Sequence, residues 1–354
     1  MIQQYKVYID PSSKILYSSY YIKGLYDCFG KKHVTFSSKP FIGLKKRKDN
    51  ELFDHFMAFV IAWGGTEYKF IVDFWDKTLI DEYAYHWCDA YAKINVSKES
   101  VFKKDKLVPI PPGFGIKIWN KKDSLIHCLK NYFISKRDPH IKFSRHWEDY
   151  MDQYERPAIK AYENNDSDIL NKKPYIFMIG RLWPHVNCIK TTNPLRREFI
   201  RVCKKLDVEF EGGLFANSNH PEYEAYKDVS FTSKVDVQTY VRNTKKSILV
   251  FNTPAVHDCH GWKLAEYFAM GKAIVSTKLS NYIPLDNDAA LPIHEVSTVD
   301  NIESDVKLLI EDAAYRNDLK NRARKYYNNV AKPSKVIEVL VKKVIPGFQH
   351  YARS

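Results

Sequence analysis

The sequence from Ile248 to Leu279 reads ILVFNTPAVHDCHGWKLAEYFAMGKAIVSTKL, and this stretch decides the fold. Its first four residues form an unbroken apolar run, as in a strand that is buried on both faces. From Trp262 to Gly271 the apolar residues recur every three or four positions, which predicts a short helix that ends at the glycine. A second apolar run begins at Ala273. Strand, loop, helix and strand in this order predict a βαβ unit with parallel strands and a right-handed crossover.

The loop from Asn252 to Gly261 lies where such sheets bind ligands, outside the carboxyl ends of the strands. The first turn of the following helix offers free backbone N–H groups and the positive end of the helix dipole, and Gly261 leaves room for a large anion. Lys263 adds a full positive charge. A phosphate would repel Glu266, so we expect this carboxylate to accept hydroxyl groups, as in a ribose site. An ordinary surface pair of Lys263 and Glu266 is the alternative, but the loop context favours a ligand.

Asp258 and Glu266 are separated by seven residues and are followed by YFAMGKAIVS at positions 267–276. This pattern resembles the donor-site signature of GT-B glycosyltransferases, which use nucleotide-sugars, and in particular the retaining family 4, or group 1, of bacterial surface-polysaccharide enzymes. The family has glutamate where this sequence has Asp258. The aspartate side chain is one carbon shorter, which affects both the contact with the sugar and the inference that the sugar keeps its anomeric configuration. The resemblance implies an α/β fold with two Rossmann-like domains facing a cleft.

The resemblance also implies roles for individual residues. Arg181, which follows a predicted strand at 175–179, would hold the donor diphosphate together with Lys190 and Lys263, and Asp258 and His260 would contact the sugar ring. The implied donor-binding residues are Arg181, Lys190, Asn252, Asp258, His260, Gly261, Trp262, Lys263 and Glu266. Arg181, Lys263 and Asp258 would be catalytic, since the cations neutralise the departing diphosphate. No metal and no cofactor is expected besides the donor itself, which would be UDP- or GDP-linked.

The N-terminal half predicts strands at 5–9, 33–36, 56–63 and 68–74, with a turn at Gly64-Gly65. Asp73 lies within the last of these apolar runs, where an unpaired carboxylate is costly to bury. Two interpretations of Asp73 have equal weight, a structural one and a catalytic one in which it orients the acceptor or acts as a base. Asp76 is a candidate N-cap for the next helix.

Residues 135–174 are polar and charged and contain little core material, which predicts a domain boundary. We expect an N-terminal, acceptor-side Rossmann-like domain at 1–168 and a C-terminal, nucleotide-sugar-binding one at 169–335. By the resemblance, residues 336–354 form a helix and tail that cross back to the first domain.

The composition narrows the classes of partner. The 354 residues carry a net charge of +13 and 45% hydrophobic residues, which indicates a globular protein that suits anionic partners. Among anionic partners, nucleic acid is the least expected, because the sequence contains no recognised nucleic-acid-binding motif. The six cysteines show no CxxC spacing, and no signal peptide or membrane-length apolar run is found. We expect a cytoplasmic protein at the inner face of the cytoplasmic membrane, with peripheral contact to anionic lipid.

The sequence therefore predicts an enzyme, a glycosyltransferase that moves a sugar from a nucleotide-sugar to a glycan or lipid-linked glycan acceptor. The reaction would be metal-independent and retaining. Two alternatives stay open: a nucleotide-sugar 2-epimerase of GT-B fold, and a catalytically silent partner protein that binds a nucleotide-sugar.

Overall fold

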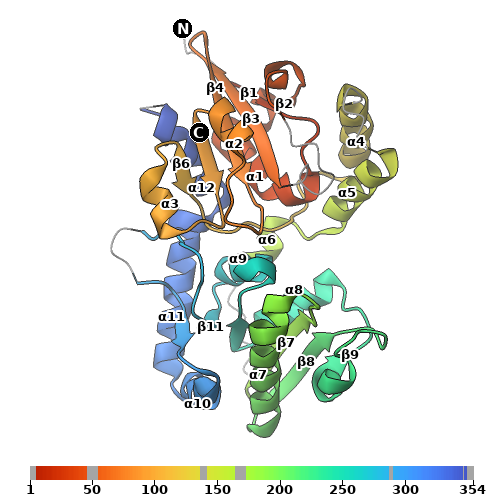
Figure 1. Ribbon diagram of the computed structural model, residues 1–354, viewed down its shortest axis with the longest axis vertical. Helices are drawn as coiled ribbons and strands as arrows, with labels where there is room; N and C mark the ends of the chain where they lie inside the picture. Colours follow the sequence, from red (N-terminus) through yellow and green to blue (C-terminus); the bar gives the residue numbers. More distant parts are fainter. Residues whose placement is uncertain are drawn as a thin grey trace. The chain divides into compact units, whose positions relative to one another are not determined.

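The computed structural model describes residues 5–45, 55–135, 142–163, 173–286, 290–345 and 347–348 (Figure 1). The chain divides into two compact units. Unit 1 comprises Met1–Ile159, Tyr282–Pro284 and Asn329–Ser354, and unit 2 comprises Lys160–Asn281 and Leu285–Asn328. The domain limit expected at residue 168 lies outside the described residues.

Parallel strands form the centre of unit 2. Its described strands are β7 (Tyr175–Arg181), β8 (Glu209–Phe215), β9 (Ser230–Phe231), β10 (Leu249–Asn252), β11 (Ala273–Thr277) and β12 (His294–Val296). They make two parallel ladders, β7-β8-β9 and β10-β11-β12. The ladders meet where the Ile248 N–H donates to the Tyr175 oxygen at 2.9 Å. The strand order is therefore β9-β8-β7-β10-β11-β12, the doubly wound order that reverses between β7 and β10.

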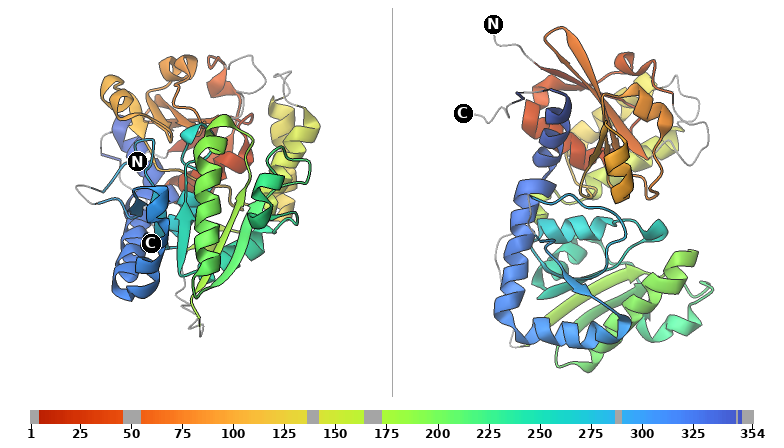
Figure 2. Two further views of the ribbon diagram at one scale, coloured as in Figure 1. Left: turned by 60° about the horizontal axis from the view of Figure 1, so that its bottom comes forward. Right: turned by 60° about the vertical axis from the view of Figure 1, so that its left-hand side comes forward.

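Helices cover the faces of this sheet (Figures 1 and 2). The described helices of unit 2 are η3 (Cys188–Thr192), α7 (Asn193–Lys205), η4 (Glu224–Val229), α8 (Val237–Lys246), η5 (Val256–Asp258), α9 (Trp262–Ala269), η6 (Val299–Asn301), α10 (Ile302–Glu311) and α11 (Ala313–Tyr326). The helix η7 (Tyr327–Ala331) spans the limit to unit 1. The apolar face of α7 packs on the sheet, where the rings of Phe199 and Phe251 stack with centroids 4.3 Å apart. The predicted unit of β10, α9 and β11 is confirmed, with Leu249 paired to Ala273.

Unit 1 contains a mixed sheet. Its strands are β1 (Lys6–Ile9), β2 (Val34–Phe36), β3 (Phe56–Trp63), β4 (Thr66–Asp73), β5 (Ala90–Lys93) and β6 (Leu107–Pro109), in the order β2-β1-β3-β4-β5-β6. Strand β3 runs antiparallel to both β1 and β4, while the other neighbours are parallel. The cause is the turn at Gly64 and Gly65, both with positive φ, because a two-residue connection joins only antiparallel strands. This half is thus α/β with one reversed strand.

The helices of unit 1 lie on both faces of this sheet. They are α1 (Ile15–Phe29), η1 (Lys31–His33), η2 (Lys39–Phe41), α2 (Glu82–Trp87), α3 (Lys98–Lys103), α4 (Lys121–Ser135), α5 (Phe143–Glu155) and α12 (Pro333–Val344), and α6 (Ile159–Tyr162) spans the limit to unit 2. The cap of α2 is Asp81, whose carboxylate accepts from the Ala84 N–H at 3.1 Å, and not Asp76 as suggested by the sequence. Gly24 lets α12 approach α1, since a Cβ there would lie 2.3 Å from the Pro333 oxygen. In the described residues no helix has the length and apolar character needed to cross a bilayer.

Candidate functional site

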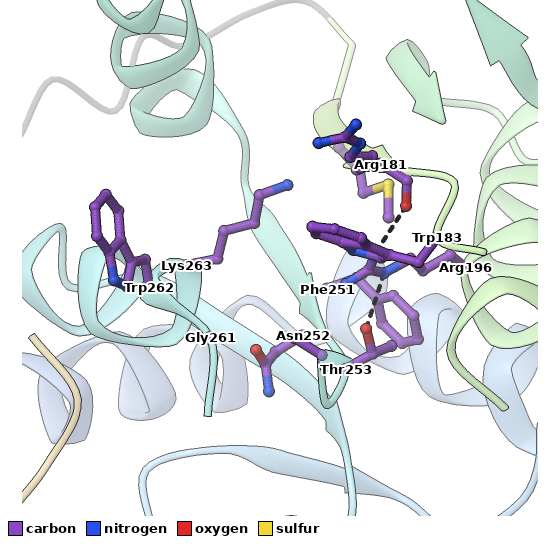
Figure 3. A pocket seen from close by; sticks show the side chains of 12 residues that line it. Arg181, Trp183, Arg196, Phe251, Asn252, Thr253, Gly261, Trp262 and Lys263 are labelled. Atoms are coloured by element: carbon purple, nitrogen blue, oxygen red, sulfur yellow. Dashed lines mark hydrogen bonds between the residues drawn. The ribbon is translucent and has the colours of Figure 1, made fainter. Parts of the chain in front are cut away.

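A pocket of about 200 Å³ opens in unit 2 at the carboxyl ends of β7 and β10 (Figure 3). The strand order reverses between these two strands, and doubly wound sheets bind their ligands at that point. The pocket is lined by Met178, Gly180, Arg181, Trp183, Arg196, Phe251, Asn252, Thr253, Ala255, Gly261, Trp262 and Lys263. Three of these described residues are cations, and none is an acid.

The structure brings together part of the set expected from the sequence. Arg181, Asn252, Gly261, Trp262 and Lys263 all line the pocket, although the Trp262 ring points away from the arginines (Figure 3). The expected residues outside the lining are Lys190, Asp258, His260 and Glu266. The predicted loop and helix start thus form one wall, and the end of β7 forms another.

The N-terminus of α9 is open toward this pocket. Gly261 is the N-cap, and it has no side chain that could cap the first turn. A Cβ at Gly261 would meet just the Ala255 Cβ, at 3.8 Å, so the backbone here is approachable. The first-turn N–H groups and the helix dipole therefore favour an anion in the pocket.

Lys263 is half-buried on the first turn of α9 and extends toward the arginines (Figure 3). Its Nζ donates to the main-chain oxygen of Ile179 in β7. Burial, together with the charge of Arg196, lowers the pKa of Lys263 to about 7, while Glu266 acts in the opposite direction. A carbonyl oxygen does not neutralise a charge, so an anion in the pocket would stabilise the protonated form of Lys263.

Arg196, on α7, is the cation that the sequence analysis missed. Its side chain is buried, with 8% exposure. The Nε donates to the Thr253 Oγ1 at 2.9 Å and the Nη1 to the Arg181 main-chain oxygen at 3.2 Å (Figure 3). Among the described residues, no carboxylate is one of the named charges that act on Arg196, and burial lowers its pKa. The chain thus keeps a buried guanidinium beside the pocket with neutral partners.

The sequence does contain a signal for Arg196. Arg196, Phe199, Ile200 and Cys203 follow the spacing of one helical face and are all buried. A charged residue at the start of an apolar stripe points toward the sheet. Because a charge is rarely buried without a partner, the pattern predicts that a ligand or an acid lies there.

Arg181, the last residue of β7, is exposed at the pocket. Its guanidinium carbon lies 5.1 Å from the centroid of the Trp183 ring. A cation over an indole face is held without losing its hydrogen-bond donors. Arg181 therefore keeps its donors available to a ligand.

Glu266 lies one turn beyond Lys263 and is buried. It accepts a hydrogen bond of 2.7 Å from the Tyr240 hydroxyl of α8. Burial and the charge of Glu266 raise the pKa of Tyr240 well above its usual value, so the phenol remains a donor. The structure thus shows Glu266 bound to a hydroxyl, which is the type of partner that we expected, but this hydroxyl is supplied by the protein.

Asp258 lies in a loop that is tied to the chain after β7. Both His257 and Asp258 have φ of 57°, a backbone conformation that is uncommon for residues other than glycine and is often found near functional sites. The Asn187 Nδ2 donates to the Asp258 Oδ1 at 2.9 Å and to the oxygen of Ala255, a pocket residue, at 3.0 Å. This link holds Asp258 beside the pocket, with its side chain exposed.

Two further expected residues lie elsewhere in unit 2. Lys190 is exposed in η3, one segment before α7. His260 is buried next to Gly261, at the end of the loop that precedes α9. Arg196, and not Lys190, supplies the second cation from this part of the chain to the pocket lining.

Asp73 belongs to the core of unit 1. It is fully buried, and its carboxylate accepts hydrogen bonds from the Tyr91 hydroxyl, the Lys93 Nζ at 2.9 Å and the Trp75 N–H at 2.8 Å. These contacts favour the structural interpretation of Asp73 over the catalytic one. Among the described residues, no group of three or more His, Cys, Asp or Glu side chains is placed to hold a metal ion.

The chain matches no family model and no curated protein by sequence. Among solved structures it is similar to a glycosyltransferase from Rickettsia africae, with 12% identity and a TM-score of 0.39 over 73% of this chain and 64% of that one. The match thus spans just under two thirds of the Rickettsia chain. The C-terminal domain of the group 1 glycosyl transferase LpcC from Francisella tularensis gives 15% identity and a TM-score of 0.33, over 49% of this chain and 97% of that one. HepE from Anabaena, solved with UDP-glucose, has 12% identity to this chain and a TM-score of 0.37, over 73% of this chain and 78% of that one.

Proposed function

We propose that the protein is a glycosyltransferase that takes a sugar from a nucleotide-sugar donor. The proposal rests on one observation: Arg181, Arg196 and Lys263 line a pocket whose described lining contains no acid. Two of the three cations are buried or half-buried, and each has a neutral oxygen as its hydrogen-bond partner. Burying a charge without a counter-charge costs several kcal/mol, about the scale that an anionic ligand offsets.

A sugar-linked diphosphate is the anion that best suits this place. The pocket combines the start of α9, the end of β7 and the point where the sheet order reverses, an arrangement that binds phosphate groups in doubly wound folds. Fixed cations at the diphosphate stabilise the negative charge that develops as the sugar departs. They would do so without a divalent metal.

The residues beside the pocket then acquire roles. We assign the ribose to Glu266 and the sugar ring to Asp258 and His260, with Lys190 as a further cation near the diphosphate. The resemblance of Asp258 and Glu266 to the donor-site signature supports these assignments and a retaining outcome. Asp73 is left out of the mechanism because its oxygens are engaged in the core of unit 1.

The acceptor that we propose is a glycan or a lipid-linked glycan at the inner face of the cytoplasmic membrane. The net charge of +13 supports an encounter with an anionic surface.

The first experiment is a thermal-shift screen of the protein against UDP-, GDP-, CMP- and dTDP-sugars. The true donor stabilises the folded state by mass action, by about 2.7 kcal/mol when its concentration is a hundred times Kd. The variants Arg181→Ala and Lys263→Met should lose this shift, whereas Lys205→Ala, on the far end of α7, should keep it. If no nucleotide-sugar stabilises the protein, or if all variants respond like the wild type, the proposal fails.

Two assays separate the alternatives. Turnover of the stabilising donor without acceptor would identify a 2-epimerase. Tight donor binding without transfer to any acceptor in a glycan panel would identify a silent binding protein.

A further inference from the structure

Helix α4 has its apolar stripe on the outside. Its exposed large hydrophobic side chains are Ile126, Leu129 and Phe133, with exposures of 51%, 46% and 64%. At about 100° per residue these three side chains share one face. The side chains that α4 buries are Ser124, Cys128, Asn131 and Ser135, which share the opposite face. We call the first set the α4 outer stripe.

This arrangement is the reverse of that in a helix at the surface of a globular protein. Such a helix places its apolar stripe toward the core and its polar residues toward water. Here α4 packs against α5, and α5 packs against α1, so α4 is the outermost helix of this layer in unit 1 (Figures 1 and 2). An apolar stripe that faces away from the core is typical of a helix that meets a partner or a membrane.

Aromatic residues of α5 extend the apolar surface. Phe143 and Trp147 are both exposed and lie one turn apart. The Phe143 ring is 5.0 Å from that of Tyr132 on α4, which itself contacts Phe133. The surface therefore continues from the α4 outer stripe to the first turns of α5, and tryptophan suits the boundary between lipid and water.

Basic residues flank this surface. Lys122 and Lys130 lie on the exposed side of α4, and Lys142 is exposed at the start of α5. Asp123, an acid of the first turn of α4, pairs with Lys31 at 3.2 Å. A second copy of the chain, docked symmetrically, would set these cations against one another. Anionic lipid headgroups match them.

We propose that the packed helices α4 and α5 dock on an anionic lipid bilayer, with the α4 outer stripe, Phe143 and Trp147 inserted at the headgroup level. The flanking cations then contact lipid phosphates. The proposal assigns the membrane contact of the proposed function to a defined surface of unit 1. It does not depend on glycosyl transfer or on the pocket of unit 2.

Flotation with vesicles tests the proposal, without any nucleotide present. The wild type should float with phosphatidylcholine vesicles that contain phosphatidylglycerol, and less with pure phosphatidylcholine. The triple variant Ile126→Gln, Leu129→Gln and Phe133→Gln should lose binding by about tenfold or more, because these side chains no longer bury apolar area in the bilayer. Lys130→Gln should weaken binding to the anionic vesicles by about fivefold and leave binding to neutral ones unchanged.

A matched control changes the same number of exposed apolar residues elsewhere in unit 1: Leu79→Gln, Tyr83→Gln and Phe102→Gln. This control should float like the wild type, and both triple variants should melt near the wild-type temperature, because neither set lies in the core. Wild-type protein that stays with the bottom fraction, or a stripe variant that floats as well as the control, would overturn the proposal. A stripe variant that abolishes self-association in sedimentation velocity, with no vesicle binding by the wild type, would overturn it in favour of a dimer interface.

Discussion

The Nη1 of Arg196 donates a hydrogen bond of 3.2 Å to the main-chain oxygen of Arg181. The end of β7 thus positions two cations. The main chain of Arg181 holds Arg196, and the side chain of Arg181 lies over the Trp183 ring. Gly180 makes room for this arrangement, since a Cβ there would lie 3.4 Å from the Arg196 Nη1 and 3.2 Å from the Leu214 Cδ2. One wall of the pocket is therefore charged and is held by contacts within the chain.

Arg196→Met should weaken the binding of the stabilising nucleotide-sugar by roughly tenfold to a hundredfold, because it removes charge-assisted hydrogen bonds worth about 1.5–3 kcal/mol. The melting temperature without ligand should stay close to that of the wild type or rise, since methionine fills similar space and removes a buried charge. Calorimetric titration and thermal melting measure the two effects, with Lys205→Met as the control on the same helix. Unchanged affinity in Arg196→Met would remove Arg196 from the site.

The stability of the free protein should depend on Lys263 at alkaline pH. The pKa of Lys263 is about 7 in the folded protein, against 10.5 for an ordinary lysine, so the unfolded chain binds more protons between these limits. The contribution of Lys263 to the free energy of unfolding therefore rises as pH increases from about 7 to about 10.5. Urea unfolding at several pH values should show this rise in the wild type and a flatter curve in Lys263→Met. Parallel curves would contradict the low pKa.

Donor binding should take up a proton above neutral pH. The diphosphate of a nucleotide-sugar stabilises the charged form of Lys263 and raises its pKa, so binding near pH 8, above the free value of about 7, draws a proton from the buffer. Titration calorimetry in buffers of different ionisation enthalpy measures this uptake. It should vanish in Lys263→Met and be small near pH 6, where Lys263 is protonated before binding. An uptake that is the same in the variant would assign the proton to another group.

Asp258→Gly and Asp258→Asn should separate sugar contact from diphosphate binding. Glycine adopts the positive φ of this position freely, so the loop keeps its conformation in the first variant. We expect both variants to bind the nucleoside diphosphate with wild-type affinity and to lose kcat/KM for transfer by at least about tenfold, the value of one hydrogen bond to a charged group. His257→Gly, at the neighbouring positive φ, is the matched control and should transfer nearly normally. Normal transfer by Asp258→Gly would exclude a sugar contact.

Asp73 and Lys93 should act as a structural pair. Asp73→Asn and Lys93→Met should each lower the free energy of unfolding by roughly 3–5 kcal/mol, because each leaves a buried charge without its partner. The double variant should lose less than the sum of the two losses. Urea unfolding of the four proteins measures this coupling. An Asp73→Asn protein with normal stability and no turnover would restore the catalytic interpretation.

Local sequence patterns predicted most of the elements that position the pocket. The βαβ unit follows from three segments whose patterns each predict one type of secondary structure. These are the apolar run at Leu249, the periodic helix before Gly271 and the apolar run at Ala273. The α/β class is confirmed for both units. The direction of β3 was not predicted, although Gly64 and Gly65 contained the information, because apolar runs do not show which way a strand points.

The candidate site was predicted less completely than the fold. Gly261 and Lys263 were predicted correctly as pocket residues because both belong to one short stretch, the loop and the start of the helix, that the sequence pattern identifies. Arg196 was missed because its contacts, Thr253 and the Arg181 backbone, come from distant parts of the chain. The roles of Asp258, Glu266 and Lys190 stay predictions.

A crystal structure of the protein with the nucleotide-sugar that stabilises it most is the decisive measurement. Our account predicts that the diphosphate lies in the pocket at the ends of β7 and β10, within hydrogen-bond distance of Arg181, Arg196 and Lys263. A diphosphate bound elsewhere, with these three side chains arranged as they are now and the pocket filled by solvent, would contradict it.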